Sequence, residues 1–298
     1  MVIKIKSTFT DSNIEVAQSF SHGFFGKKLD QRTSHSCGFV ERSSTNAFNV
    51  IYSSDNLNIT IGEQSVECHE LSEYLETLNI TSVLLDSTSL DIPELALLFS
   101  AISSVGIKEL IIIYIEPDDY TSKENDQPVH EDFDLSEDII GFEASGIPTI
   151  SQPYSDVEEK LFVFFLGFEE NRLLGAFETF DISSEATKII FGVPAFKSGW
   201  ETRSFKKNIR VLKDNTLFGR IGYCSANNPS SAINQLRLFN SYDSKPLYIL
   251  PIGTKPNSIG VLLYLIENKN SRLLYDQPRK KSSRSYGVGR QHLYKVSF

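Results

Sequence analysis

The chain of 298 residues is long enough for one large hydrophobic core or two ordinary ones, and its 40% hydrophobic content is typical of a globular protein. A formal net charge of -9 argues against broad binding of nucleic acid over the whole surface, because an acidic face repels the phosphate backbone, and leaves only local basic patches open. The three cysteines are widely spaced and odd in number, which excludes a disulfide framework or zinc motif and favours a reducing, cytoplasmic compartment.

The sequence contains no segment typical of export or membrane insertion. Its first twenty residues lack the long apolar core of a signal peptide, and no run of about 18 apolar residues occurs. We therefore expect no membrane partner.

The first part of the chain predicts strands and turns, followed by alternating helices and strands. Up to about Gly62, short apolar bursts are separated by Ser, Asn and Asp, which is typical of strands joined by turns. The expected elements that follow are a helix over 65–77, a strand over 80–85, a helix over 91–103 and a strand over 108–115. This alternation indicates a parallel sheet with crossover helices.

Residues 116–137 interrupt this pattern. They are rich in acidic, proline and polar residues and have almost no apolar periodicity, so we predict a long exposed loop or linker. We interpret the acidic run as solvated rather than as a metal site, because it has no fixed framework. A domain boundary in or soon after it divides the chain into residues 1–155 and 156–298.

The second half repeats the alternation more regularly. The expected strands are 161–166, 188–192, 220–224, 246–252, 272–275 and 292–297, and the expected helices are near 170–180, 202–212, 230–240 and 257–267. The predicted fold class is α/β with two Rossmann-like units, of which the C-terminal one is a doubly wound, mainly parallel sheet.

The strongest candidate site is the turn Gly253-Thr254-Lys255 between a buried strand and a helix. Ligands of doubly wound sheets bind beyond the carboxyl ends of the strands, where helix N-termini favour anions. The turn supplies a glycine for close approach, a hydroxyl and a cation, and Ser258 lies near the helix start. This predicts an anion, most often a phosphate; a plain loop with a surface lysine is the alternative, because P-loop spacing is missing.

Other loops at the same edge add candidate contacts. Asn227 lies at a helix entry that capping alone also explains. Glu169 and Glu170 with Arg172 could contact a ribose and a phosphate, or form a structural pair within a helical turn. Trp200, the one tryptophan, could stack on a base or belong to the core.

In the first half, Asp86 and Thr88 follow a predicted strand at the position equivalent to Gly253-Thr254-Lys255. The segment 86–89 is therefore either an oxygen-rich ligand loop or a helix cap made by Ser89 or Asp91. A basic patch, Arg279-Lys280-Lys281 with Arg284, is either a solvated loop or an electrostatic rim for a phosphate-bearing ligand.

Catalytic motifs are weak. The five histidines have no HExxH or other metal spacing, and no GxSxG elbow occurs, so we predict no metal site and no cofactor. A Cys–His nucleophile built on Cys224 remains an alternative, because spatial partners need not be close in sequence.

Two strand–loop–helix segments carry a family resemblance. Residues 83–103, with the Asp86-Ser87-Thr88 loop, and residues 248–266, with the Gly253-Thr254-Lys255 loop, resemble the CARF-like nucleotide-sensing domains of prokaryotic antiviral defence systems. In that family a GTK-like sequence after a strand often helps to hold a nucleotide second messenger. The resemblance implies a cytoplasmic sensing or scaffold component of a defence-type assembly, with a nucleotide-like anion as its ligand. A protein partner or a homo-oligomer is expected with it.

Two other classes of function stay open. One is an enzyme acting on a nucleotide or nucleoside, with Glu169 or Glu170 as general base and Lys255 as electrostatic stabiliser. The other is a protein-interaction subunit whose acidic loop contacts a basic partner. We lean towards binding without catalysis.

Overall fold

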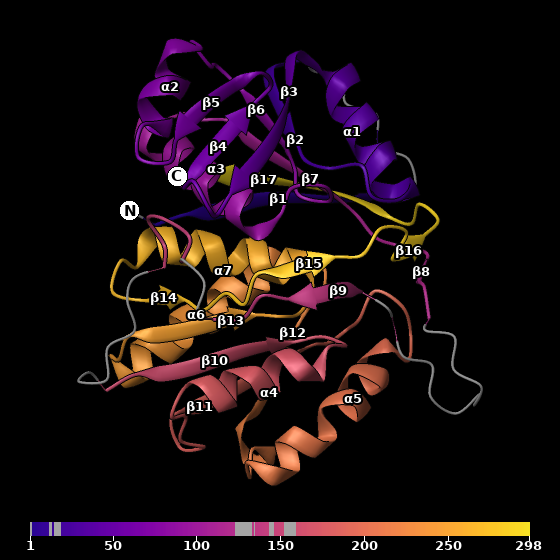
Figure 1. Cartoon of the computed structure of the whole chain (residues 1–298), viewed down its shortest axis with the longest axis vertical. Helices are drawn as coiled ribbons and strands as arrows, with labels where there is room; N and C mark the ends of the chain where they lie inside the picture. The colour runs from indigo at the N-terminus through magenta and orange to yellow at the C-terminus, as the bar shows by residue number, and fades with distance from the viewer. Residues whose placement is uncertain are drawn as a thin grey trace. The chain divides into compact units, whose positions relative to one another are not determined.

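The computed structural model describes residues 2–11, 14, 19–122, 133, 135–142, 146–151 and 159–298. The chain forms two compact units: Met1–Asp138 with Pro278–Phe298, and Ile139–Gln277 (Figure 1). We call the first the mixed-sheet unit and the second the parallel-sheet unit. The second is thus an insertion between two segments of the first.

The mixed-sheet unit is built on an eight-stranded sheet. Its strands, in spatial order, are β1 (Lys4–Asp11), β17 (Gln291–Ser297), β7 (Leu110–Ile115), β6 (Val83–Asp86), β2 (Phe20–Phe25), β3 (Ser44–Ser53), β4 (Asn58–Ile61) and β5 (Gln64–Glu67). The four central strands β7, β6, β2 and β3 run parallel, and the flanking strands pair antiparallel.

The described helices of this unit are α1 (Gln31–Ser43), α2 (Leu71–Thr77) and α3 (Ile92–Val105). Helices α1 and α3 follow the parallel strands β2 and β6, whereas α2 follows the antiparallel strand β5. Asp30 and Thr33 start α1 with a reciprocal capping box, and Gly106 ends α3 with a φ of 78°, which a glycine adopts without strain. From β2 the chain passes through α1 to β3 on one side, whereas β6 and β7 lie on the other side, so the topological switch point is between β2 and β6.

Two small sheets of two strands each are also present in the described part of the chain. They are β8 (Asp119–Tyr120) with β16 (Ser285–Tyr286), and β9 (Ser136–Ile139) with β15 (Pro278–Lys280).

The parallel-sheet unit contains five strands, all parallel. Their spatial order is β12 (Ile221–Cys224), β11 (Thr187–Gly192), β10 (Leu161–Leu166), β13 (Leu247–Pro251) and β14 (Arg272–Leu273). In the chain order of this unit that is 3-2-1-4-5, the order of the first five Rossmann strands. The predicted doubly wound parallel sheet is confirmed.

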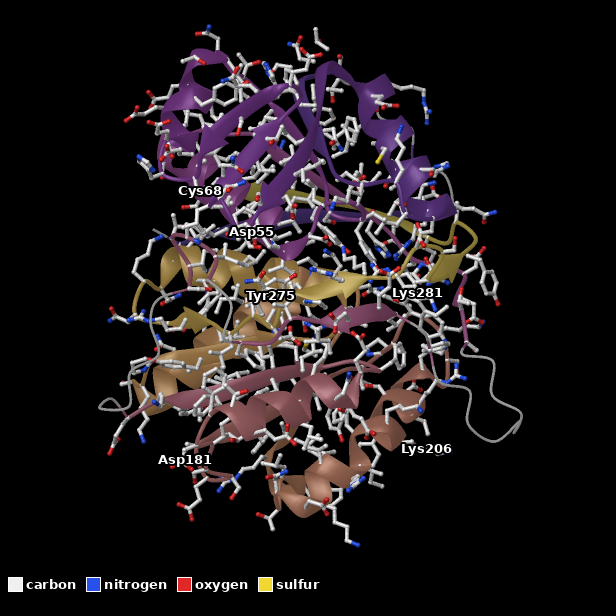
Figure 2. All side chains as sticks on the ribbon, in the orientation of Figure 1. Asp55, Cys68, Asp181, Lys206, Tyr275 and Lys281 are labelled. Carbon is white, nitrogen blue, oxygen red and sulfur yellow. The ribbon has the colours of Figure 1, made fainter. Side chains whose placement is uncertain are left out.

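Its helices cover both faces of the sheet (Figure 1). They are α4 (Glu170–Thr179), α5 (Trp200–Asp214), α6 (Pro229–Asp243) and α7 (Lys255–Glu267), with a short 3-10 helix, η1 (Phe218–Arg220). Leu173 of α4 and Leu212 of α5 pack against Phe162 and Phe164 of the central strand β10. All six residues of β10 are buried, as expected for a strand covered on both faces. Charged side chains such as Asp181 and Lys206 are exposed (Figure 2).

The structure differs from the sequence-based division at the C-terminus. The sequence pattern places residues 278–298 in the second domain, but they belong to the mixed-sheet unit, where β17 lies between β1 and β7. Alternating apolar residues predict a strand but do not say which strand lies beside it, and here the neighbours are far away in sequence.

Three predicted elements need correction. Residues 31–43, which the sequence pattern places among strands and turns, form helix α1; its buried positions Thr33, Ser36, Cys37 and Val40 have helical spacing, but two of them are polar, so apolar periodicity does not reveal it. The helix over 65–77 is a strand followed by a shorter helix, β5 and α2, because the polar turn at 68–70 separates them. The predicted loop over 116–137 contains β8 and the first two residues of β9, and it begins with Glu116, which is 4% exposed. Its residues 123–132 and 134 lie outside the described part of the chain.

Candidate functional site

The parallel-sheet unit has its topological switch point between β10 and β13. From β10 the chain turns through α4 to β11 on one side, and from β13 it turns through α7 to β14 on the other. The Gly253-Thr254-Lys255 turn directly follows β13, so it lies at the position where doubly wound sheets bind their ligands.

Two glycines allow the loops at this switch point to approach each other closely. A Cβ on Gly167 would lie 2.7 Å from the Ile252 carbonyl oxygen, and one on Gly253 would lie 3.2 Å from the Leu166 carbonyl oxygen. A larger residue at Gly167 would push the two loops apart.

The first turn of α7 is tied to the loop after β12. Thr254 is its N-cap, accepting from the Asn257 N–H and donating from its hydroxyl to the Ala226 carbonyl at 2.5 Å. The Asn257 amide donates to the Ser225 carbonyl at 3.0 Å, and the Ser258 hydroxyl donates to the Thr254 carbonyl at 3.2 Å. Thr254 and Ser258 therefore have structural partners of their own.

These contacts limit what the helix N-terminus offers to an anion. Pro256 has no N–H, and the N–H of Asn257 already donates to Thr254. Lys255, the first residue of α7, is half-buried and carries the positive charge of this turn. The charge of Lys255 adds to the positive end of the α7 dipole.

Asn227 joins this group of residues at the end of β12. Its side-chain oxygen accepts from the Ser225 hydroxyl at 2.8 Å, while Asn228 caps α6. The structure thus brings Gly253, Thr254, Lys255, Ser258 and Asn227 to one sheet edge, as the sequence predicted.

Arg172 is a structural residue. Its guanidinium makes a bidentate ion pair with buried Asp276, with Nε–Oδ2 and Nη2–Oδ1 distances of 2.7 and 2.6 Å, and its Nη1 lies 3.2 Å from Glu169 Oε2. Burial acts to lower the pKa of Arg172, but the hydrogen bonds and charge of Asp276 outweigh it and raise this pKa above its ordinary value. Of the two readings of Glu169 and Arg172, the structure supports the internal pair.

Trp200 has the packing of a core aromatic. It is the first residue of α5, is 7% exposed, and meets the Phe168 ring edge-on at a centroid distance of 5.7 Å. Glu170, by contrast, is exposed at the start of α4.

Cys224 lacks the environment of a nucleophile. Burial raises the pKa of its thiol to about 12, so almost none of it is thiolate at neutral pH. Within the described residues, no group of three or more His, Cys, Asp or Glu side chains could hold a metal ion.

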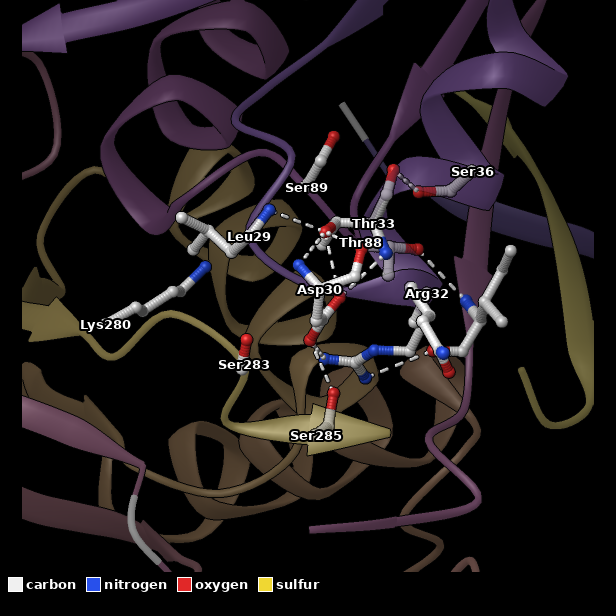
Figure 3. Close-up of polar contacts among 12 residues, drawn as sticks. Leu29, Asp30, Arg32, Thr33, Ser36, Thr88, Ser89, Lys280, Ser283 and Ser285 are labelled. Atoms are coloured by element: carbon white, nitrogen blue, oxygen red, sulfur yellow. Dashed lines mark hydrogen bonds and ion pairs between the residues drawn. The ribbon is translucent and has the colours of Figure 1, made fainter. Parts of the chain in front are cut away.

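Asp86 and Thr88 belong to the other unit, at its own switch point, where Asp86 is the last residue of β6 and Thr88 lies in the turn after it. Topologically this is the position equivalent to the Gly253 turn, as the sequence indicated. Asp86 is fully buried and accepts from the Ser36 and Ser89 hydroxyls at 2.7 and 2.5 Å. Thr88 Oγ1 accepts from the Ile115 N–H at 3.1 Å (Figure 3). The Asp86 side chain thus connects β6 to α1, and the Thr88 side chain connects the turn after β6 to β7.

A C-terminal segment, which the sequence did not predict to be here, lies over the switch point of the mixed sheet. Residues 278–289, which we call the strap, donate from the Ser283 N–H to the Leu29 carbonyl at 2.9 Å and from the Ser285 hydroxyl to Asp30 (Figure 3). Lys280 of the strap pairs with Asp91. Two features of the sequence point to this segment, namely the basic run and Gly287. The φ of 74° at Gly287 and its close packing against Asp118 require a glycine.

No protein-family model and no curated protein matches the chain. In the described part of the chain, none of the helices combines the length and apolar character needed to cross a bilayer.

Proposed function

We propose that this protein binds a nucleotide-like anion at the carboxyl edge of the five-stranded sheet and acts as a sensing or scaffold component rather than as a catalyst. The observation that carries the proposal is the position of Lys255, at the first helical residue beyond the switch point of a Rossmann-like sheet. A lysine and a helix N-terminus at one place favour a phosphate group.

Because several predicted ligand contacts are occupied by side-chain contacts within the protein, fewer residues can bind a ligand here than the sequence suggested. Arg172, Trp200 and Ser258 serve the fold, so the ligand-facing group is reduced to Lys255 and the flanking loops at Asn227 and Gly253. The resemblance to CARF-like domains motivates a nucleotide second messenger as the ligand and a defence-type assembly as the setting.

The enzymatic alternative now depends on Glu170, because Glu169 is held by Arg172. An exposed carboxylate lacks the desolvated setting that makes a good general base, and this favours binding over catalysis.

Isothermal titration calorimetry with a panel of linear and cyclic nucleotides tests the proposal. We expect Lys255→Ala to raise Kd by about 10- to 100-fold, the equivalent of a charge-assisted phosphate contact of roughly 1.5–3 kcal/mol. Its melting temperature should change little, because a half-buried lysine at a helix start contributes little to folding.

Lys213→Ala is the matched control, since Lys213 is an exposed lysine at the other end of a helix in the same unit. It should leave Kd unchanged. Equal affinities of wild type and Lys255→Ala, or binding of nothing in the panel, would refute the anion site.

A further inference from the structure

The mixed-sheet unit gathers three cationic side chains at its own switch point. Arg32 lies in the first turn of α1, and Lys280 and Arg284 belong to the strap. Arg32 is about 250 positions away in sequence from the two strap residues, and the strap contacts at Leu29 and Asp30 bring these segments together (Figure 3).

Arg32 is 3% exposed and incompletely paired. Its Nη1 donates to the Ile115 carbonyl at 3.2 Å and to the Tyr114 hydroxyl at 3.4 Å, and Nη2 lies 3.9 Å from Asp30 Oδ2. Its Nε is buried and has no hydrogen-bond partner among the described residues. An unsatisfied buried N–H of a charged group is costly, so a polar partner at this place would be favoured.

Lys280 is nearly as enclosed, with 12% of its side chain exposed. Burial, followed by the charges of Arg284 and Arg32, lowers the pKa of this lysine well below its ordinary value. Asp30 and Asp86 oppose this effect in part, but their oxygens already accept hydrogen bonds from Ser285 and Thr33, and from Ser36 and Ser89.

The partner of Lys280 in this structure is Asp91, the N-cap residue of α3. Asp91 makes no side-chain cap hydrogen bond to the helix, so its carboxylate is directed to the lysine rather than to the backbone. The carboxylate therefore stands where a phosphate oxygen would meet both Lys280 and the positive end of α3.

We infer that the strap and the starts of α1 and α3 form a binding site for a phosphate-bearing anion, which displaces Asp91 from Lys280 and contacts Arg284. The charge of Arg32, which acts on Lys280, adds to the positive charge of this site. This site is on the other sheet from Lys255 and does not depend on the function proposed above.

Binding should be accompanied by proton uptake. The groups that act on Lys280 are Arg284, Arg32, Asp30, Asp86 and Asp91. A bound anion raises the pKa of Lys280 back towards its ordinary value, so the lysine takes up protons on binding wherever the pH lies between its pKa in the free and in the bound protein. As pH rises through the lowered pKa of the free protein, binding weakens.

The experiment is calorimetric titration with inorganic pyrophosphate at several pH values, in buffers of different ionisation enthalpy, using a Lys255→Gln background so that the first site does not contribute. The inference predicts saturable binding and a proton uptake greater than that of Lys280→Arg, in which the proton exchange of pyrophosphate itself is the same. Lys280→Gln should raise Kd by about tenfold or more, the loss expected for one charge-assisted contact.

Arg279→Gln is the matched control, because Arg279 is an exposed cation next to Lys280 on the same strap. Its Kd should stay within about threefold of the parent, a smaller change than one charge-assisted contact. Lys280→Arg should keep binding but lose the proton uptake that Lys280 contributes, because a guanidinium remains charged.

Thermal melts without pyrophosphate show whether Lys280→Gln is folded. If this variant is unfolded, the affinity and proton uptake of Lys280→Arg test the inference. Absence of pyrophosphate binding, an equal loss in Arg279→Gln and Lys280→Gln, or proton uptake that is as large in Lys280→Arg as in the parent would overturn the inference.

Discussion

At the scale of single residues, most polar side chains near the two switch points serve the backbone. Thr254 and Ser258 contact carbonyl oxygens, and Asp86 accepts hydroxyl and N–H groups. The reason is that a loop leaving a buried strand carries N–H and C=O groups that must find partners, and leaving one unpaired costs about 1–3 kcal/mol. A hydroxyl or carboxylate in such a loop is therefore weak support for a ligand.

The cysteines provide a residue-scale prediction about catalysis. Burial raises the pKa of the Cys37 and Cys224 thiols to about 12 and that of Cys68 to about 11. A pKa of about 12 leaves roughly one thiol in ten thousand ionised at about pH 8, so all three should react slowly with Ellman's reagent in the native protein. They should react fully in guanidinium chloride. Fast reaction of Cys224 in the native protein would support the Cys–His nucleophile again.

At the scale of elements, the close packing of α6 against α7 depends on one glycine, Gly260. A Cβ on Gly260 would lie 2.8 Å from the Ala232 Cβ and closer still to the Pro229 carbonyl oxygen. Glycine normally lowers helix stability relative to alanine, so its place in the middle of α7 reflects the close approach of the two helices.

We therefore expect Gly260→Ala to destabilise the parallel-sheet unit by about 1–3 kcal/mol through overpacking, despite the better helix propensity of alanine. Gly175 in α4 is the control, because a Cβ added there would meet no atom within 4 Å. Gly175→Ala should stabilise by about 0.5–1 kcal/mol. Urea unfolding followed by circular dichroism measures both changes, and shifts of the same sign would contradict this account of the helix contact.

At the scale of the whole molecule, the parallel-sheet unit interrupts the mixed-sheet unit. The chain crosses between the units near Asp138 and again near Gln277. The segment that returns supplies β17, whose Tyr294 and Val296 are fully buried between β1 and β7. The C-terminus is thus an internal part of the first sheet.

A chain ending at Gln277 should lose the mixed-sheet unit, because removing β17 leaves β1 without a partner and exposes the edge of β7. Residues 139–277 alone should fold, since all five parallel strands and their four α-helices lie within them. Amide NMR spectra of the full chain and of the two fragments measure this. If the fragment ending at Gln277 keeps the dispersed resonances of the mixed-sheet unit, β17 is dispensable and the expectation fails.

The amino-acid sequence by itself determined the α/β class, the doubly wound C-terminal sheet and the turn at Gly253-Thr254-Lys255, because apolar periodicity reports which faces are buried and a glycine-containing turn reports where a strand becomes a helix. Only the tertiary structure decided that β17 joins the first sheet, that Asp276 holds Arg172, and that the strap lies over Asp30 and Asp91. These are contacts between residues distant in sequence, and no local pattern encodes them, since the partner of a strand edge or a charge is set by topology.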